Sequence, residues 1–113
     1  MASPARLAIA KTGGFGVACA AIEGLSRTLT AELSPQGIRV VCLRPHRITD
    51  TLNAADFPDM KLDEFRGFLE NMTLLKKMPT LAEVADTAVF LASDKAAAMT
   101  GATANLTCGF DVD

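Results

Sequence analysis

The chain is 113 residues long, half of them apolar, with a formal net charge of −2 at neutral pH. This length allows one compact domain at most. The acidic balance argues against binding to nucleic acid, and no apolar run is long enough to span a membrane. No secretion signal follows Met1, so we expect a cytoplasmic protein.

The cysteines, Cys19, Cys42 and Cys108, are odd in number and lie far apart among apolar neighbours. We therefore expect reduced, buried thiols and not a disulfide framework. His46 is the only histidine, and one histidine cannot build a metal centre. We expect no metal site.

Residues 1–14 are predicted to be irregular, and a long helix is predicted over residues 15–34. A bulky apolar stripe along this helix predicts the face that packs on a sheet. A stripe of small residues permits the close approach of another helix. The third side is polar, and Glu23 and Arg27 on it form a favourable i,i+4 pair. The bulky stripe is Ala18, Ile22, Leu25, Leu29 and Leu33; the small stripe is Val17, Ala21, Gly24, Thr28 and Ala31.

The rest of the chain predicts an α/β fold with one right-handed β-α-β crossover. The run Ile38–Leu43, apolar apart from Arg39, is typical of a parallel strand covered on both faces. Thr80 and Glu83 form a capping box, which predicts the start of a helix. The elements expected after the first helix are a strand over 38–43, a loop over 46–60, a helix over 62–77, a helix from 80 to about 92 and a strand over 102–107.

The first helix opens with Phe15-Gly16-Val17-Ala18-Cys19-Ala20-Ala21-Ile22-Glu23-Gly24-Leu25. This run resembles the active-site helix of the short-chain dehydrogenase/reductase family, which reads Tyr-x-x-x-Lys-Ala-Ala-x-Glu-Gly-Leu. In that family the phenol acts as general acid or base, and the ammonium one turn away lowers its pKa. Here Phe15 replaces the tyrosine and Cys19 replaces the lysine. The resemblance implies that the helix is kept without its chemistry, so we expect no catalytic residue.

Three further segments extend the resemblance over roughly residues 13–110. Pro45-His46-Arg47-Ile48-Thr49-Asp50-Thr51 is similar to the family's nicotinamide loop, which implies vestigial cofactor contacts at Pro45, Ile48 and Thr51. His46 stands where the family has glycine and adds bulk there. The other segments are Glu32–Val40 and Ala92–Gly101. Residues 52–79 correspond in the family to the substrate-side insertion.

The family's glycine-rich phosphate-binding turn does not occur after any apolar strand of this sequence. Family members of one domain run to about 250 residues. We therefore interpret residues 1–113 as a single truncated domain with a partial Rossmann-like fold, the family's C-terminal half. By resemblance the cofactor is NAD or NADP, but we expect none for this chain alone. Ser3 and Lys11 lie near the expected site and are interpreted as ordinary polar residues.

An isolated pair of strands is marginal in water, so we expect oligomerisation to complete the fold. The resemblance implies a homodimer or homotetramer formed through the helix over residues 15–34. Three function classes remain open. We favour a non-catalytic, self-associating remnant; the alternatives are part of an NAD(P)-dependent oxidoreductase and a module that binds small hydrophobic ligands through residues 62–77.

Overall fold

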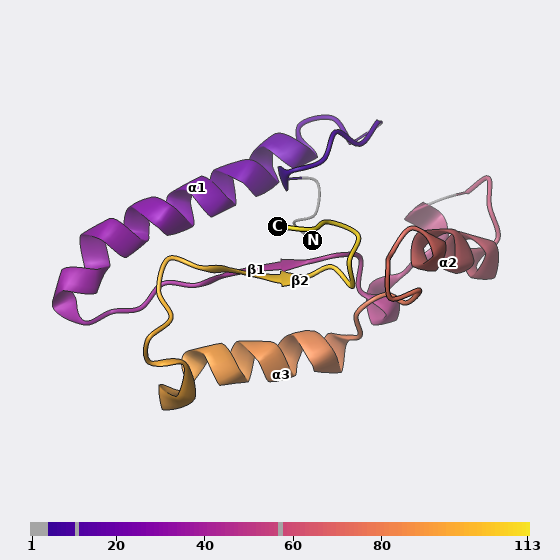
Figure 1. The fold of residues 1–113 in the computed structure, drawn as a ribbon. Helices are drawn as coiled ribbons and strands as arrows, with labels where there is room; N and C mark the ends of the chain where they lie inside the picture. Colours follow the sequence, from indigo (N-terminus) through magenta and orange to yellow (C-terminus); the bar gives the residue numbers. More distant parts are fainter. Residues whose placement is uncertain (1–4, 11, 57) are drawn as a thin grey trace.

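The computed structural model describes residues 5–10, 12–56 and 58–113, and its secondary structure follows the predicted order. The two strands pair in parallel, with Cys42 opposite Thr103 and Pro45 opposite Leu106. Helix α1 lies over one side of this pair and helix α3 over the other, while α2 lies beyond the carboxyl end of β1 (Figure 1). The helices and strands are α1 (Phe15–Leu33), β1 (Cys42–Pro45), α2 (Leu62–Asn71), α3 (Leu81–Ala92) and β2 (Thr103–Leu106).

The first strand begins later than predicted, at Cys42, and includes Arg44 and Pro45. Ahead of the strand, Val40 is bonded to the segment that leads into β2: the Val40 N–H donates to the Thr100 hydroxyl at 3.1 Å. The parallel ladder begins where the Cys42 N–H reaches the carbonyl of Ala102, at 2.9 Å. The strand predicted over 38–43 is therefore about three residues too early. Apolar residues indicate burial, but they do not indicate where pairing with the second strand begins.

Helix α2 ends at Asn71, well short of the predicted residue 77. The buried Thr73 hydroxyl accepts the N–H of Lys77 at 3.1 Å and lies 2.9 Å from the carbonyl of Glu70. Such side-chain bonds compete with the helical backbone ladder. Lys76 then adopts a φ of +55°, which a right-handed helix cannot include. The chain from Met72 to Met78 is therefore a turn that leads to α3.

The predicted orientation of α1 is wrong. Cys19 and Glu23 are its buried residues, whereas Ile22 and Leu25 of the bulky stripe are exposed. The small stripe is exposed as well, apart from the half-buried Gly24. Glu23 pairs with Arg44 of β1 in place of the predicted partner Arg27. A buried guanidinium requires a carboxylate beside it, and this requirement rotates the helix so that the side with Cys19 and Glu23 faces the sheet.

Helix α3 is capped at both ends. The predicted capping box is present: the Thr80 hydroxyl accepts the Glu83 N–H at 3.2 Å, and the Glu83 carboxylate accepts the Thr80 N–H at 2.9 Å. At the other end, the Arg39 guanidinium donates to the carbonyls of Leu91 and Ser93, at 2.9 and 3.1 Å. These bonds satisfy backbone groups that a helix end otherwise leaves unpaired.

An apolar cluster lies around α2, where Phe65, Leu69 and Met78 are buried and Leu52 packs against them. Elsewhere large apolar side chains lie on the surface of the chain. They occur on all three helices, in the α2–α3 turn and near the C-terminus, and the most exposed are Val17, Ile22, Leu25, Phe68, Leu74, Leu75, Leu81, Val89 and Val112.

Candidate functional site

The start of α1, the end of β1 and the loop after it share one end of the molecule (Figure 1). In an open parallel sheet, ligands bind at the carboxyl ends of the strands. Phe15 is the first residue of α1 and is partly exposed. Cys19 follows one turn later with only 2% of its surface exposed. Ser3 and Lys11, the other residues considered near this site, lie outside the described residues.

The three predicted cofactor contacts lie along the chain from the end of β1 to the short turn that follows it. Pro45 is buried at the end of β1, Ile48 precedes a short 3₁₀ turn, and Thr51 ends that turn in an exposed position. The Thr51 hydroxyl donates to the Ile48 carbonyl at 3.0 Å, so its proton is used within the loop. Cofactor binding at these residues stays a prediction.

Two hydrogen bonds fasten this loop to the start of α3. The Asp50 carboxylate accepts the N–H of Leu81 at 2.7 Å. The N–H of Thr49 donates to the carbonyl of Pro79 at 3.0 Å. The loop is therefore attached to β1 at its first residue and to the start of α3 through Thr49 and Asp50.

A buried cation, Arg44, lies at the centre of the layer between the sheet and α1, with 2% of its surface exposed. Its guanidinium lies 3.3 Å from the Glu23 carboxylate and 3.2 Å from that of Asp111. It also pairs with Asp113, which in turn pairs with Arg6. Burial acts to lower the pKa of Arg44, but hydrogen bonds to Asp113 and Glu23 outweigh it and raise that pKa. The guanidinium is therefore a permanent charge.

Sequence reasoning missed this network, although one signal was present. Arg44 follows directly on the run Ile38–Leu43, which is apolar apart from Arg39 and was expected to form a strand covered on both faces. A charged residue in such a strand is almost never fully buried without a partner. The partners could not be named from the sequence, since Asp111 lies 67 residues away and Glu23 had been assigned to the outer face.

His46 lies under the ring of Phe110, with centroids 4.2 Å apart and an angle of 14° between the planes. Burial lowers the pKa of the imidazole to about 4, and the neighbouring Arg47 cation acts in the same direction. His46 is therefore a neutral ring at physiological pH. Arg47 itself lies over the ring of Phe65 of α2, 5.6 Å from its centroid.

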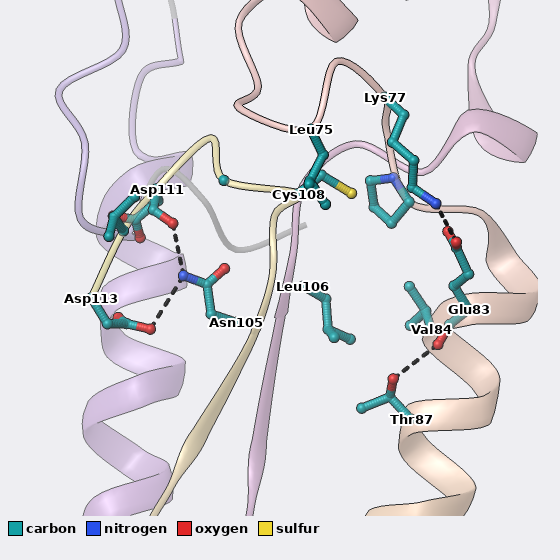
Figure 2. Close-up of a pocket in the computed structure, with 13 residues that line it drawn as sticks. Leu75, Lys77, Glu83, Val84, Thr87, Asn105, Leu106, Cys108, Asp111 and Asp113 are labelled. Carbon is teal, nitrogen blue, oxygen red and sulfur yellow. Dashed lines mark hydrogen bonds and ion pairs between the residues drawn. The ribbon is translucent and has the colours of Figure 1, made fainter.

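A cleft of about 540 Å³ opens at the outer edge of β2, between the start of α3 and the chain after β2 (Figure 2). Apolar side chains such as Leu75, Val84 and Leu106 line it. The ion pair between Lys77 and Glu83 lies on its rim. Its volume is in the range of small-molecule pockets.

The described residues contain no group of three or more His, Cys, Asp or Glu side chains that could hold a metal ion. Cys19, Cys42 and Cys108 are not joined by disulfides. Burial raises the pKa of the Cys42 and Cys108 thiols. Within the part of the chain that the structure describes, no helix is long and apolar enough to cross a membrane.

A family model described as enoyl-(acyl carrier protein) reductase matches residues 1–111. The chain belongs to the short-chain dehydrogenase/reductase family. It is 35% identical over 96 residues to (+)-borneol dehydrogenase 2 of Salvia officinalis, covering 80% of this chain and 34% of that protein. It is 35% identical over 100 residues to the NADH-dependent enoyl-[acyl-carrier-protein] reductase FabI of a Synechocystis strain, covering 87% of this chain and 37% of that protein.

Solved structures agree with this assignment. Carveol dehydrogenase from Mycobacterium avium, solved in complex with NAD, is 26% identical and superposes with a TM-score of 0.85, covering 95% of this chain and 42% of that one. A short-chain dehydrogenase family protein from Francisella tularensis superposes with a TM-score of 0.83 at 22% identity, covering 95% of this chain and 47% of that one. The predicted partial Rossmann-like α/β fold is thus confirmed. The chain spans about a third of the length of the curated relatives it matches.

Proposed function

We propose that this chain is a non-catalytic, self-associating member of the short-chain dehydrogenase/reductase family, which binds a second copy of itself through α1. The observation that carries the proposal is the pair Phe15 and Cys19 at the start of that helix. Phenylalanine has no proton to transfer, and a thiol supplies no positive field for a neighbouring acid. No Lys, Arg or His lies within one turn of Cys19 to take over that role.

The loop after β1 does not fit a nicotinamide either. The one hydroxyl that the family resemblance assigns to the cofactor, that of Thr51, donates to the Ile48 carbonyl in its own turn. His46, which replaces a glycine of the family's loop, places a buried ring under Phe110 where the family has no side chain. Both features support a member of the family that has lost its cofactor contacts.

The exposed side of α1 supports self-association. Val17, Ile22 and Leu25 are 73, 57 and 58% exposed, and the small residues Ala21 and Thr28 lie exposed among them. Exposed apolar side chains that gather on one side of a helix mark an interaction surface. A patch that is complementary to itself about a two-fold axis gives a closed dimer. Small residues there allow the two helix backbones to approach closely.

Replacing Leu25 with aspartate is expected to weaken self-association at least tenfold, because each copy would bury an unpaired carboxylate in the contact. Sedimentation velocity over a range of protein concentrations measures the dissociation constant. Phe68→Asp is the matched control, since Phe68 is 54% exposed on a different helix, α2. A parent chain that is monomeric and folded at micromolar concentration would contradict the proposal, as would equal effects of the two variants.

Added NAD(H) or NADP(H) at millimolar concentration is expected to leave the melting temperature unchanged. A ligand stabilises a fold only in proportion to its occupancy, and the described loop lacks a free hydroxyl at Thr51 for it. Differential scanning fluorimetry checks this, with Thr51→Ala as the control for the site. An upward shift of several degrees that Thr51→Ala removes would instead favour the oxidoreductase alternative.

A further inference from the structure

The carboxylate of Asp113 is held by side chains from three segments that lie far apart in the sequence. One of its oxygens pairs with the guanidiniums of Arg44 in β1 and of Arg6 in the N-terminal segment. Its other oxygen accepts a hydrogen bond from the Asn105 amide of β2 at 3.2 Å. Both oxygens of one carboxylate are therefore contacted, and we call Arg6, Arg44 and Asn105 the carboxylate site.

Other contacts hold the carboxylate site in place independently of Asp113. Two further nitrogens of the Arg44 guanidinium face the carboxylates of Glu23 and Asp111, at 3.3 and 3.2 Å. The Asn105 amide also donates to the Asp111 carbonyl at 2.8 Å, and its oxygen lies 2.7 Å from the Thr107 hydroxyl. Donors that are already ordered in this way lose little freedom when an anion binds.

Asp113 is the most exposed member of this arrangement. Its side chain is 54% exposed, whereas that of Arg44 is 2% exposed. The hydrogen bond from Arg44 holds the pKa of Asp113 below its ordinary value, and the bond from Asn105 acts in the same direction. The site therefore favours the charged form of a carboxylate, and solvent reaches the carboxylate that it holds.

The carboxylate site borders the cleft at the outer edge of β2. Asn105 and Asp113 lie among the residues that line this cleft of about 540 Å³. Figure 2 shows these polar side chains on the α1 side of the sheet, and Leu106 and Val84 on the α3 side. A molecule that lies across the edge of the sheet therefore meets basic groups at one end and apolar side chains along the rest of its length.

We propose that this cleft binds a monocarboxylic acid with an apolar body, whose carboxylate takes the place of Asp113 between Arg6 and Arg44. With Asp113 displaced, the two guanidiniums face the two carboxylates of Glu23 and Asp111. That cluster is neutral and accepts one negative charge, whereas a dianion would bring a second charge without a counter-charge. The apolar body covers the apolar wall of the cleft and removes it from water, which favours binding.

The first test compares three probes. Octanoate has a charge and an apolar chain, octanamide keeps the chain without the charge, and acetate keeps the charge without the chain. NMR titration of the parent chain, followed at the Asn105 amide and the Val84 and Leu106 methyl groups, measures each dissociation constant. We expect octanoate to bind at least about tenfold more tightly than either other probe. Equal affinity of octanoate and octanamide, equal affinity of octanoate and acetate, or no binding of octanoate would overturn the proposal.

The second test places the acid at the carboxylate site. Asp113→Asn removes the charge that competes with octanoate, so the affinity should rise about tenfold. Arg6→Met removes one of the two guanidiniums, so the affinity should fall about tenfold. Arg27→Met is the matched control, because Arg27 is exposed on α1 outside the cleft. It should leave the affinity within about twofold of the parent value.

Two results of the second test would overturn the proposal. Octanoate that adsorbs on exposed apolar side chains elsewhere would bind the parent chain and all three variants alike. A loss of affinity in Asp113→Asn would mean that Asp113 holds the site together and does not compete for it. Circular dichroism confirms that each variant remains folded.

Discussion

Replacing Arg44 with methionine is expected to lower the free energy of unfolding by about 3–5 kcal/mol, the usual cost of removing one partner from a buried ionic network. The methionine fills a similar volume but leaves the buried Glu23 carboxylate without this cation, and Asp111 with only the Arg6 guanidinium, 3.9 Å away. Both carboxylates are less than a tenth exposed, so water cannot replace the lost pairing. Urea denaturation at one fixed protein concentration measures the loss.

Arg27→Met is the matched control for this prediction. Arg27 lies on the exposed side of α1, where removal of a charge changes stability by less than about 0.5 kcal/mol. A loss below about 1 kcal/mol in Arg44→Met would show that water solvates the two carboxylates in solution. The layer between α1 and the sheet would then be open, and the assignment of Arg44 as the centre of that layer would be wrong.

Local signals in the sequence predicted much of the fold. The capping box at Thr80 and Glu83 depends only on residues three positions apart, and it forms as predicted. The long helix at Phe15–Leu33 and the order of the two strands also follow from patterns within a few residues. Elements whose stability rests on neighbours in the sequence are the ones that sequence patterns describe well.

The rotation of α1 could not be predicted in the same way. Its apolar stripe faces outward because Glu23 pairs with Arg44, which lies 21 residues away in the chain. A helix with apolar residues on two sides leaves its inner face undecided until the chemistry of the covered strand is known. The apolar stripe is then available for the contact with another copy that we propose.

The sequence predicted where the residues of the candidate site lie in the chain, but it did not predict which side chains they contact. Four matched segments placed Pro45, Ile48 and Thr51 in one loop; in the structure Pro45 ends β1, Ile48 precedes a 3₁₀ turn and Thr51 ends that turn, and their role as cofactor contacts stays a prediction. Nothing in that pattern indicates that Phe110, 64 residues after His46, lies on the imidazole ring. Contacts between segments so far apart depend on the path of residues 107–113, which have no periodic signal of their own.

Replacing Gly109 with alanine is expected to lower the free energy of unfolding by about 2–5 kcal/mol. Two costs add in this estimate: a left-handed backbone with a side chain costs roughly 1–2 kcal/mol, and overpacking a filled site costs roughly 1–3 kcal/mol. Gly109 has a φ of +80°, and a Cβ there would lie 2.7 Å from the Cβ of Leu74. Leu74 cannot turn its own Cβ aside, and the Leu75 N–H holds this turn to the Cys108 carbonyl at 3.1 Å.

Gly37→Ala separates the two costs, because Gly37 has a nearly equal φ of +77° but no atom within 4 Å of the added Cβ. Gly37→Ala should lower the free energy of unfolding only by the backbone cost, about 1–2 kcal/mol. The difference between the two variants in urea denaturation therefore measures the contact between Gly109 and the turn after α2. Equal losses in Gly109→Ala and Gly37→Ala would mean that the backbone at Gly109 moves away from Leu74 at no cost, and that the two are not packed together in solution.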